Sequence, residues 1–231
     1  MSPLSVKSPP SIKSFVLRSG RETAAQRRAY DSLAPRFVVP FEDREMDFAA
    51  VFGNGAPVVA EIGFGMGAAT AAIAEENPAN NYLGVEVHRP GIGRLLWEIE
   101  RRSLSNIRIV EHDAVEVFEK MIPPRSLEGI HLFFPDPWPK KRHHKRRLVR
   151  RPFTATLAAR LKPRGYLYMV TDWEDYAQWA LIELGATNGL ANTCGGFAEP
   201  RAWRPRTKFE QKGLAKDHQV RELFFESNNG A

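Results

Sequence analysis

One carboxylate stands directly before the densest run of positive charge in the chain. Asp136 lies in Phe133-Phe-Pro-Asp-Pro-Trp-Pro, where prolines on both sides restrict the backbone, and its setting predicts a buried side chain. From Lys140 to Arg151 there are eight Lys or Arg and no acid, whereas the whole chain carries a net charge of only +6. The positive charge is therefore a local patch, as expected of a contact with nucleic-acid phosphates, although charge runs also occur in solvated loops.

The residues of this patch have separate expected roles. Lys140 and the arginines that follow would neutralise phosphates near a target base. His143 and His144 show no partner in the sequence, so we expect them to donate hydrogen bonds on the phosphate side. With only six scattered histidines we expect no metal site. Trp138 would either stack on a base or pack in the core.

A second informative motif is Glu61-Ile-Gly-Phe-Gly-Met-Gly. Gly63, Gly65 and Gly67 follow an apolar run and precede an Ala-rich one, which predicts a tight turn where a ligand can approach the backbone. With Ala68 the spacing also matches a dinucleotide fingerprint, so a nicotinamide or flavin enzyme is an alternative. The acid at Glu61 suits a ligand that carries positive charge, which favours S-adenosylmethionine.

Two further acids close later apolar runs. Glu86 lies twenty-one residues after Gly65, where a carboxylate commonly accepts hydrogen bonds from both ribose hydroxyls; NAD enzymes use the same arrangement. Asp113 is placed either to accept a hydrogen bond from an adenine amino group or to cap the helix that follows it. Both roles of Asp113 stay open.

These residues need a scaffold, and the apolar pattern predicts a mostly parallel sheet with helices between its strands. Nearly continuous apolar runs, typical of strands covered on both faces, span residues 58–62, 82–87, 107–110, 129–134 and 166–171. Helices are expected at about residues 67–77, 90–103, 114–121, 147–161 and 173–185. Acids and glycines at the ends of these runs predict a ligand crevice at the carboxyl edge of the sheet.

The two ends of the chain differ from this core. Residues 1–29 are rich in Ser and Pro and predict a disordered or weakly docked tail, which leaves residues 30–231 as a single domain. Residues 190–197 and 220–225 predict an antiparallel hairpin at the sheet edge. The chain has one cysteine, Cys194, and no long apolar stretch, so we expect a cytoplasmic protein without disulfides or a membrane span.

Two later segments give weaker signals. The segment from Arg201 to Gly213 mixes cations with aromatic residues around a proline, which is typical of a substrate lid but also of an ordinary basic surface. Asp172, in Thr171-Asp-Trp, is interpreted first as a cap on the following helix.

Together the motifs resemble the bacterial tRNA (guanine-N7)-methyltransferases. The resemblance covers about residues 30–227, and its most specific part is the block that begins at Phe133. It rests on Glu61-Ile-Gly-Phe-Gly-Met-Gly, Gly84-Val-Glu-Val-His, Phe133-Phe-Pro-Asp-Pro-Trp-Pro-Lys-Lys-Arg-His, Thr171-Asp-Trp and Thr207-Lys-Phe-Glu. The resemblance implies an α/β fold, that of the class I, Rossmann-like S-adenosylmethionine-dependent methyltransferases, with a mostly parallel sheet and an antiparallel C-terminal edge.

The resemblance also implies an activity and a set of contacts. The enzyme would transfer a methyl group from S-adenosylmethionine to N7 of a guanosine in the tRNA variable loop, as a monomer or homodimer and without a membrane or a metal. Contacts to the cofactor are implied for Glu61, Gly63, Gly65, Gly67, Glu86, Asp113 and Asp136, and Asp136 would also be catalytic. Contacts to the substrate are implied for Lys140, Asp172, Thr207, Lys208, Phe209 and Glu210. Interaction with RNA is implied for Arg142, His143, His144, Lys145, Arg146 and Arg147.

The chemistry of such a reaction agrees with these residues. Guanine N7 already has an in-plane lone pair, so methyl transfer from a sulfonium needs alignment more than it needs a base. A carboxylate at Asp136 would stabilise the growing charge on the purine or hold the guanine through its ring N–H and amino group. Asp-Pro-Trp is also similar to the Asp/Asn-Pro-Pro-aromatic loops of amino methyltransferases. Another RNA base (amino) methyltransferase is therefore the alternative, followed by a non-catalytic RNA-binding protein on the same fold.

Overall fold

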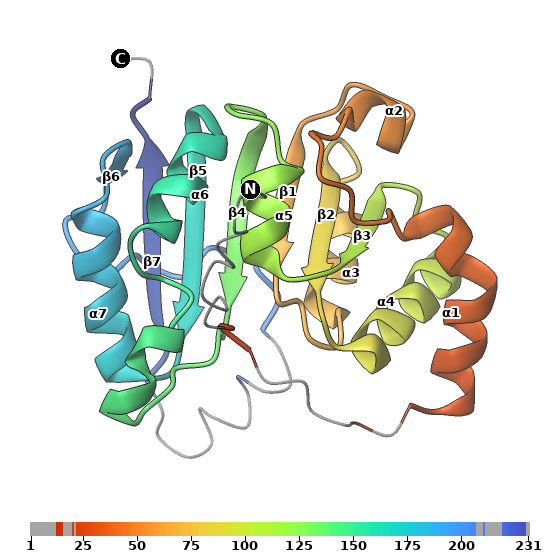
Figure 1. Cartoon of the computed structure of the whole chain (residues 1–231), viewed down its shortest axis with the longest axis horizontal. Coiled ribbons are helices and arrows are strands. Elements are labelled where there is room, and N and C mark those ends of the chain that lie inside the picture. Colours follow the sequence, from red (N-terminus) through yellow and green to blue (C-terminus); the bar gives the residue numbers. More distant parts are fainter. Residues whose placement is uncertain (1–12, 16–19, 21, 207–209, 211–218, 230–231) are drawn as a thin grey trace, which may run out of the picture.

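A seven-stranded sheet organises the chain in the computed structural model, which describes residues 13–15, 20, 22–206, 210 and 219–229. The strand order is β3-β2-β1-β4-β5-β7-β6. The parallel strands are β1 Val58–Ile62, β2 Asn81–Glu86, β3 Ile107–Glu111, β4 Leu127–Phe133 and β5 Leu161–Thr171. The strands β7 Arg221–Ser227 and β6 Leu190–Asn192 are antiparallel additions next to β5. The carboxyl ends of the parallel strands meet at one edge, the lower edge in Figure 1.

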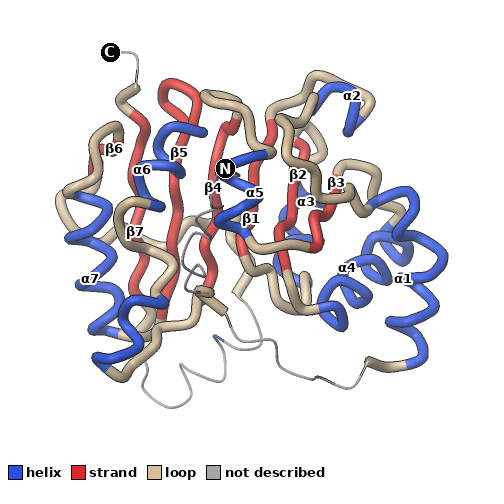
Figure 2. The backbone as a smooth tube through the Cα atoms, in the orientation of Figure 1, coloured by secondary structure: helices blue, strands red, loops and turns tan. Residues whose placement is uncertain are grey.

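Helices cover the two faces of the sheet unequally (Figures 1 and 2). One face is packed by α5 Ala114–Lys120, α6 Phe153–Arg160 and α7 Glu174–Gly185. The other face is packed over β1, β2 and β3 by α1 Ala24–Phe37, α3 Ala68–Glu76 and α4 Arg89–Arg102. Two short helices, α2 Phe48–Phe52 and the 3₁₀ helix η1 Lys141–Arg146, lie in connections. Side chains alternate between the faces, so Ile130 and Leu132 of β4 enter the first core and Phe133 contacts the second.

The predicted βαβ order and the antiparallel edge are confirmed, with two differences in the helices. The helix expected at 147–161 is shorter: α6 begins only at Phe153 and ends at Arg160, and η1, at residues 141–146, lies before the expected range. Pro152 stands at the N-cap of α6, where it has no N–H to donate, and it disfavours a helical conformation in the residue before it. The sequence pattern therefore predicted a start of this helix that is too early in the chain.

The second difference concerns the segment 1–29, because α1 begins inside it at Ala24. Thr23 Oγ1 accepts a hydrogen bond from the Gln26 N–H at 3.2 Å, and Gln26 Oε1 accepts one from the Thr23 N–H at 2.7 Å. This reciprocal capping box was a sequence signal for the helix start. Ala29 is buried, and α1 packs against α4.

The face of β4, β5 and β7 that α5, α6 and α7 leave uncovered carries aromatic side chains. Trp203, from the segment between β6 and β7, lies over them: its ring centroid is 5.1 Å from that of His131 and 5.4 Å from that of Tyr168. His131 is fully buried, and burial lowers its pKa to about 3, so it is a neutral packing residue. Trp203 of the connecting segment therefore covers part of this face, beside the part that α1, α3 and α4 pack.

Arg204 fixes the same segment to the sheet through a buried ion network. Its guanidinium bonds both oxygens of Glu210, at 2.7 and 2.8 Å, and Glu222 of β7 at 2.7 Å. Its Nε also donates to the Tyr168 hydroxyl at 3.2 Å. All three charged side chains are at most 4% exposed. Removal of the arginine would leave two carboxylates buried without their cation.

We predict that Arg204→Met lowers the free energy of unfolding by about 3–5 kcal/mol, because breaking a buried ion pair leaves uncompensated charge. The measurement is urea unfolding at pH 7. Arg28→Met, at an exposed position of α1, serves as the control and changes stability by less than about 0.5 kcal/mol. A loss below about 1 kcal/mol in Arg204→Met would show that the network contributes little.

Candidate active site

A cavity of about 400 Å³ opens at the carboxyl edge of the sheet, where the sequence predicted a ligand crevice. Its size suits a small organic ligand. It lies at the ends of β1, β2 and β4 and brings together several residues that the sequence singled out. Its lining includes Gly63, Gly65, Glu86 and Asp136, together with Ser14, Phe15, His88, His112 and Ala114.

The glycine loop after β1 forms one wall of the cavity. Gly63 and Gly65 have φ values of +71° and +57°, in the left-handed region that favours glycine. A side chain at either position would meet no atom within 4 Å, so the space above the loop is open to a ligand. At Gly67, the N-cap of α3, a Cβ would instead lie 2.7 Å from Leu95. The first two glycines therefore face the cavity, and the third serves helix packing.

Glu86 holds this loop in place. Its Oε2 accepts a hydrogen bond from the Gly65 N–H at 2.9 Å. Its Oε1 accepts from the N–H groups of Val87 at 2.7 Å and His88 at 3.0 Å. A carboxylate has room for about four acceptor contacts, so Glu86 can fix the loop and still present an acceptor to the cavity. Its contact with ribose hydroxyls stays a prediction.

Glu61, which precedes the glycine loop on β1 and does not itself line the cavity, is the most unusual carboxylate near the site. It is only 4% exposed, and its Oε2 has no hydrogen-bond partner among the described residues. Burial raises its pKa to about 7. A buried carboxyl oxygen without a partner is costly, and a cationic ligand would supply the missing interaction.

Asp113 caps α5, which is one of the two roles the sequence left open. Its Oδ1 accepts a hydrogen bond from the Val115 N–H at 3.1 Å. Its Oδ2 accepts one from Lys13 Nζ at 2.9 Å, so part of the segment before α1 is docked beside the cavity. His112 and Ala114 on either side line the cavity, and an adenine contact by Asp113 stays a prediction.

Asp136 lines the cavity but is exposed, so the expectation of a buried side chain was wrong. The reason is that the chain leaves the sheet after Phe133, and the proline-rich loop carries Asp136 to the rim. Phe134 and Trp138 have φ values of +52° and +47°, each costing about 1–3 kcal/mol in a residue with a Cβ. Hydrogen bonds hold this strained loop: the Phe134 N–H donates to the Val170 carbonyl at 2.8 Å.

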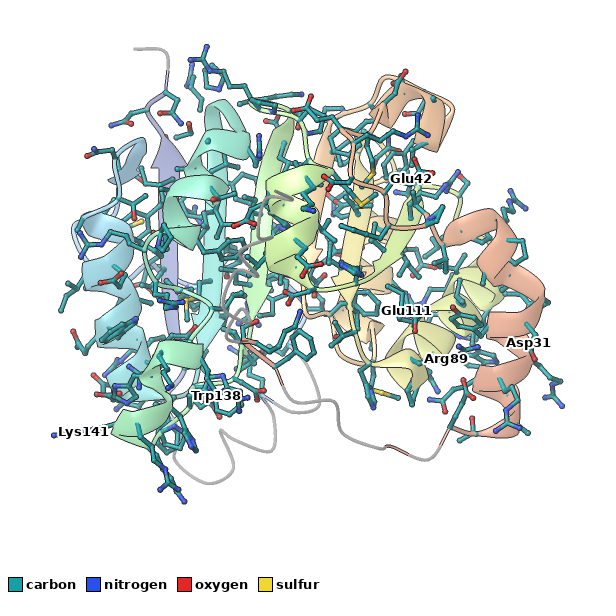
Figure 3. The ribbon with its side chains drawn as sticks, viewed as in Figure 1. Asp31, Glu42, Arg89, Glu111, Trp138 and Lys141 are labelled. Atoms are coloured by element: carbon teal, nitrogen blue, oxygen red, sulfur yellow. The ribbon has the colours of Figure 1, made fainter. Side chains whose placement is uncertain are left out.

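The basic run splits into exposed and buried parts. Lys140, Lys141, Arg142 and Lys145 are exposed on and beside η1, and Figure 3 shows Lys141 pointing away from the sheet. His143, His144 and Arg146 are half-buried, and Arg147 has no exposed side-chain surface. Arg147 therefore cannot reach RNA in this structure. The Trp138 ring packs against Arg146 of η1, whose guanidinium carbon lies 4.6 Å from the ring centroid.

Of the remaining predicted contacts, the two that the structure describes, Asp172 and Glu210, do not line the cavity. The N-cap of α7 is Trp173, one residue after Asp172, and a capping role of the Asp172 side chain stays a prediction. Glu210 pairs with Arg204 on the aromatic face. Thr207, Lys208 and Phe209 lie outside the described residues. Ser14 and Phe15 of the docked segment were missed, because nothing in a Ser- and Pro-rich sequence marks them.

Within the described residues, no group of three or more His, Cys, Asp or Glu is arranged to hold a metal ion. No helix that the structure describes has the length and apolar character to cross a membrane.

Comparisons with known proteins give a consistent result. A family described as "Putative methyltransferase" matches residues 55–223. A tRNA (guanine-N(7)-)-methyltransferase of Burkholderia thailandensis is 56% identical over 93% of this chain and 81% of the relative. A protein of the same name from Nitrosospira multiformis is 50% identical over 95% of this chain and 96% of its own length.

Solved structures show the fold. The 16S rRNA methyltransferase KamB superposes with a TM-score of 0.58 at 12% identity, over 78% of this chain and 92% of that one. TrmN from Thermus thermophilus gives a TM-score of 0.52 at 17% identity, over 74% of this chain and 44% of its own. The seven-stranded arrangement is that of the class I S-adenosylmethionine-dependent methyltransferases.

The contact between α4 and the glycine loop generates a prediction. A Cβ on Gly91 would lie 2.0 Å from the Gly65 carbonyl oxygen, which is main chain and cannot rotate away. Gly91→Ala should displace the loop and speed hydrogen exchange of its bonded amides at Gly63 and Gly65 by about tenfold or more. Gly185→Ala, where the Cβ meets nothing within 4 Å, is the matched control and should leave these rates unchanged. Equal rates in both variants would mean that α4 does not fix the loop.

Proposed function

The chain belongs to the tRNA (guanine-N(7)-)-methyltransferase family, and from that premise we propose that it methylates N7 of a guanosine in the tRNA variable loop. The methyl donor is S-adenosylmethionine, and the substrate places the enzyme in the cytoplasm. The observation that carries the proposal is the position of Asp136. Asp136 lies between the cavity beside the glycine loop and the exposed cations that start at Lys140.

The residues in and next to the cavity fit S-adenosylmethionine, which carries an ammonium, a sulfonium and two ribose hydroxyls. Glu61 offers a buried carboxyl oxygen without a partner among the described residues, which suits a cation. Gly63 and Gly65 leave open space above their backbone, and Glu86 presents a carboxylate at the cavity wall. Bound there, the cofactor supplies an electrophilic methyl group.

Asp136 is proposed to receive the guanine. Its carboxylate is an acceptor, so it can pair with the ring N–H and the amino group of the base. Methyl transfer passes one positive charge from the sulfonium to the purine and moves no proton. A fixed carboxylate beside the purine stabilises that charge as it develops, and the strained, hydrogen-bonded loop keeps the carboxylate from relaxing away.

The exposed cations are proposed to hold the tRNA backbone. Lys140, Lys141, Arg142 and Lys145 are arranged around η1, beside the rim of the cavity where Asp136 lies. Phosphate contacts of this kind position a nucleic acid without reading its sequence. They would deliver the variable loop to Asp136 and leave recognition of the base to the cavity.

The test of this function is transfer of labelled methyl from S-adenosylmethionine to unmodified tRNA, followed by nucleoside analysis. We expect the label in 7-methylguanosine. Label in another nucleoside would support the amino methyltransferase alternative. Binding of both ligands without transfer would favour an RNA-binding protein.

We predict that Asp136→Asn lowers kcat by about 100-fold, because a neutral amide stabilises less positive charge. The Kd for S-adenosylmethionine should change by less than about threefold, since the glycine loop is intact. Asp31→Asn, on the exposed side of α1 in Figure 3, is the control and should retain full turnover. Near-normal kcat in Asp136→Asn would remove Asp136 from the reaction.

A second prediction follows from the pKa of Glu61. Burial raises this pKa from 4.5 to about 7, so the folded protein binds more protons than the unfolded one between these values. Glu61 therefore lowers stability as the pH rises from about 4.5 to 7, and a cationic ligand should ionise it again. Calorimetry at pH 6, in buffers of different ionisation enthalpy, should detect release of close to one proton on cofactor binding. Glu61→Gln should abolish the release; a release that persists would assign it to another group.

A further inference from the structure

Arg147 belongs to the basic run from Lys140 to Arg151 but differs from the exposed members of that run in burial. Lys141, Arg142 and Lys145 are exposed to solvent, whereas the Arg147 side chain is 0% exposed. A buried guanidinium cannot meet a phosphate, yet burial of a charge is costly unless partners compensate for it. The contacts of Arg147 therefore show what it does in the protein.

The guanidinium joins the Asp136 loop to α7. Its Nε donates to the Pro137 carbonyl at 2.9 Å, and its Nη2 donates to the Asp175 carboxylate. The bond to Arg147 lowers the pKa of Asp175, which stays ionised as the counterion. The guanidinium carbon lies 5.1 Å from the ring centroid of Tyr176 and 5.2 Å from that of Trp179. One side chain thus satisfies a carbonyl, a carboxylate and two aromatic faces.

The same two aromatic residues hold the chain just after Arg147. The Tyr176 hydroxyl accepts a hydrogen bond from the Val149 N–H at 3.1 Å. The Trp179 indole N–H donates to the Val149 carbonyl at 2.8 Å. Both main-chain groups of Val149 are therefore hydrogen-bonded to side chains of α7. These bonds hold the main chain close to Arg147, which contacts the Asp136 loop.

The bonded carbonyl belongs to the residue next to Asp136. Phe134 and Trp138, two residues before and after Asp136, both have left-handed backbones that would relax without support. The Phe134 N–H is tied to β5, and the Pro137 carbonyl is tied to Arg147. Arg147 thereby supplies the support on the C-terminal side of Asp136.

We propose that Arg147, with Asp175 as its counterion, is a positioning residue that sets the Asp136 loop, and that it does not contact the tRNA. The inference rests on the proposed function, since it assigns Arg147 a part in the same reaction. Lysine cannot substitute for it, because an ammonium lacks the planar fork that bonds two acceptors while it stacks on rings. Displacement of a reacting group by about 1 Å can cost about 100-fold in rate.

The experiment compares Arg147→Met and Arg147→Lys with Lys145→Ala, an exposed cation two residues away. We expect both Arg147 variants to lower kcat by about 10- to 100-fold, with the KM for tRNA and its salt dependence unchanged. Lys145→Ala should instead keep kcat, raise the KM, and reduce the salt slope by about 0.7–0.9. A flattened salt slope in Arg147→Met with kcat retained would make Arg147 a phosphate contact and overturn the proposal.

A control separates positioning from a general loss of stability. Arg160 also bonds main-chain carbonyls, those of Phe118 at 2.8 Å and Glu119 at 2.9 Å in the last turn of α5, but it does not line the cavity. Arg160→Met should destabilise the fold and leave kcat per folded molecule unchanged. Asp175→Asn, at a carboxylate 64% exposed, provides a milder variant and should lower kcat in the same direction as Arg147→Met. If Arg160→Met lowered kcat equally, the effect of Arg147 would be one of stability alone.

A readout without methyl transfer keeps this inference distinct from the proposed function. Hydrogen exchange of the Phe134 amide and of its neighbours in the loop should become faster by about tenfold in Arg147→Met and stay unchanged in Lys145→Ala. Absence of 7-methylguanosine with the unmodified protein would refute the proposed function alone. Unchanged exchange in Arg147→Met would refute the positioning role, whatever the substrate is.

Discussion

The three hydrogen bonds that the Glu86 carboxylate accepts from Gly65, Val87 and His88 are the constraint on which the cavity depends. The bond from Gly65 fixes the turn after β1 to the end of β2, and those from Val87 and His88 orient the carboxylate; all three glycines of the turn have conformations that few other residues adopt. The parallel sheet brings the ends of β1, β2 and β4 to one edge, but it does not decide the path of the loops beyond them. The buried Glu86 carboxylate fixes the path of the glycine loop, and the space above the glycines is left open.

The side of the cavity where Asp136 lies is held by the same kind of contact, with a buried cation in place of a buried anion. A buried cation, Arg147, holds a backbone carbonyl beside Asp136, as the buried anion Glu86 holds the Gly65 amide of the glycine loop. Each of these two buried charges is compensated within the protein, whereas Asp136 and the cations of η1 are exposed, where a ligand of opposite charge can reach them. Fixed groups of this kind lower the reorganisation that a reaction requires.

The sequence predicted the sheet and the carboxyl-edge crevice well, because apolar runs and terminal acids report directly on burial and strand ends. It did not predict which basic residue is buried: Arg146 and Arg147 are neighbours in one run, and only the tertiary contacts with Pro137 and α7 separate them. Asp136 was placed inside for a similar reason, since prolines show that a loop is stiff and not which way it points. The capping box at Thr23 was visible, whereas the pairing of Arg204 with Glu222 required the order of β5 and β7.

The most direct test of the account uses a tRNA transcript in which 7-deazaguanosine replaces guanosine, so that a C–H group stands where N7 would be. The substituted tRNA keeps its phosphates and the Watson–Crick edge of the base. We predict that the substituted tRNA binds with an affinity within about threefold of the unmodified transcript, and that it receives no methyl group. Methyl transfer to the substituted tRNA at an ordinary rate would contradict the account, because the acceptor would then be another atom.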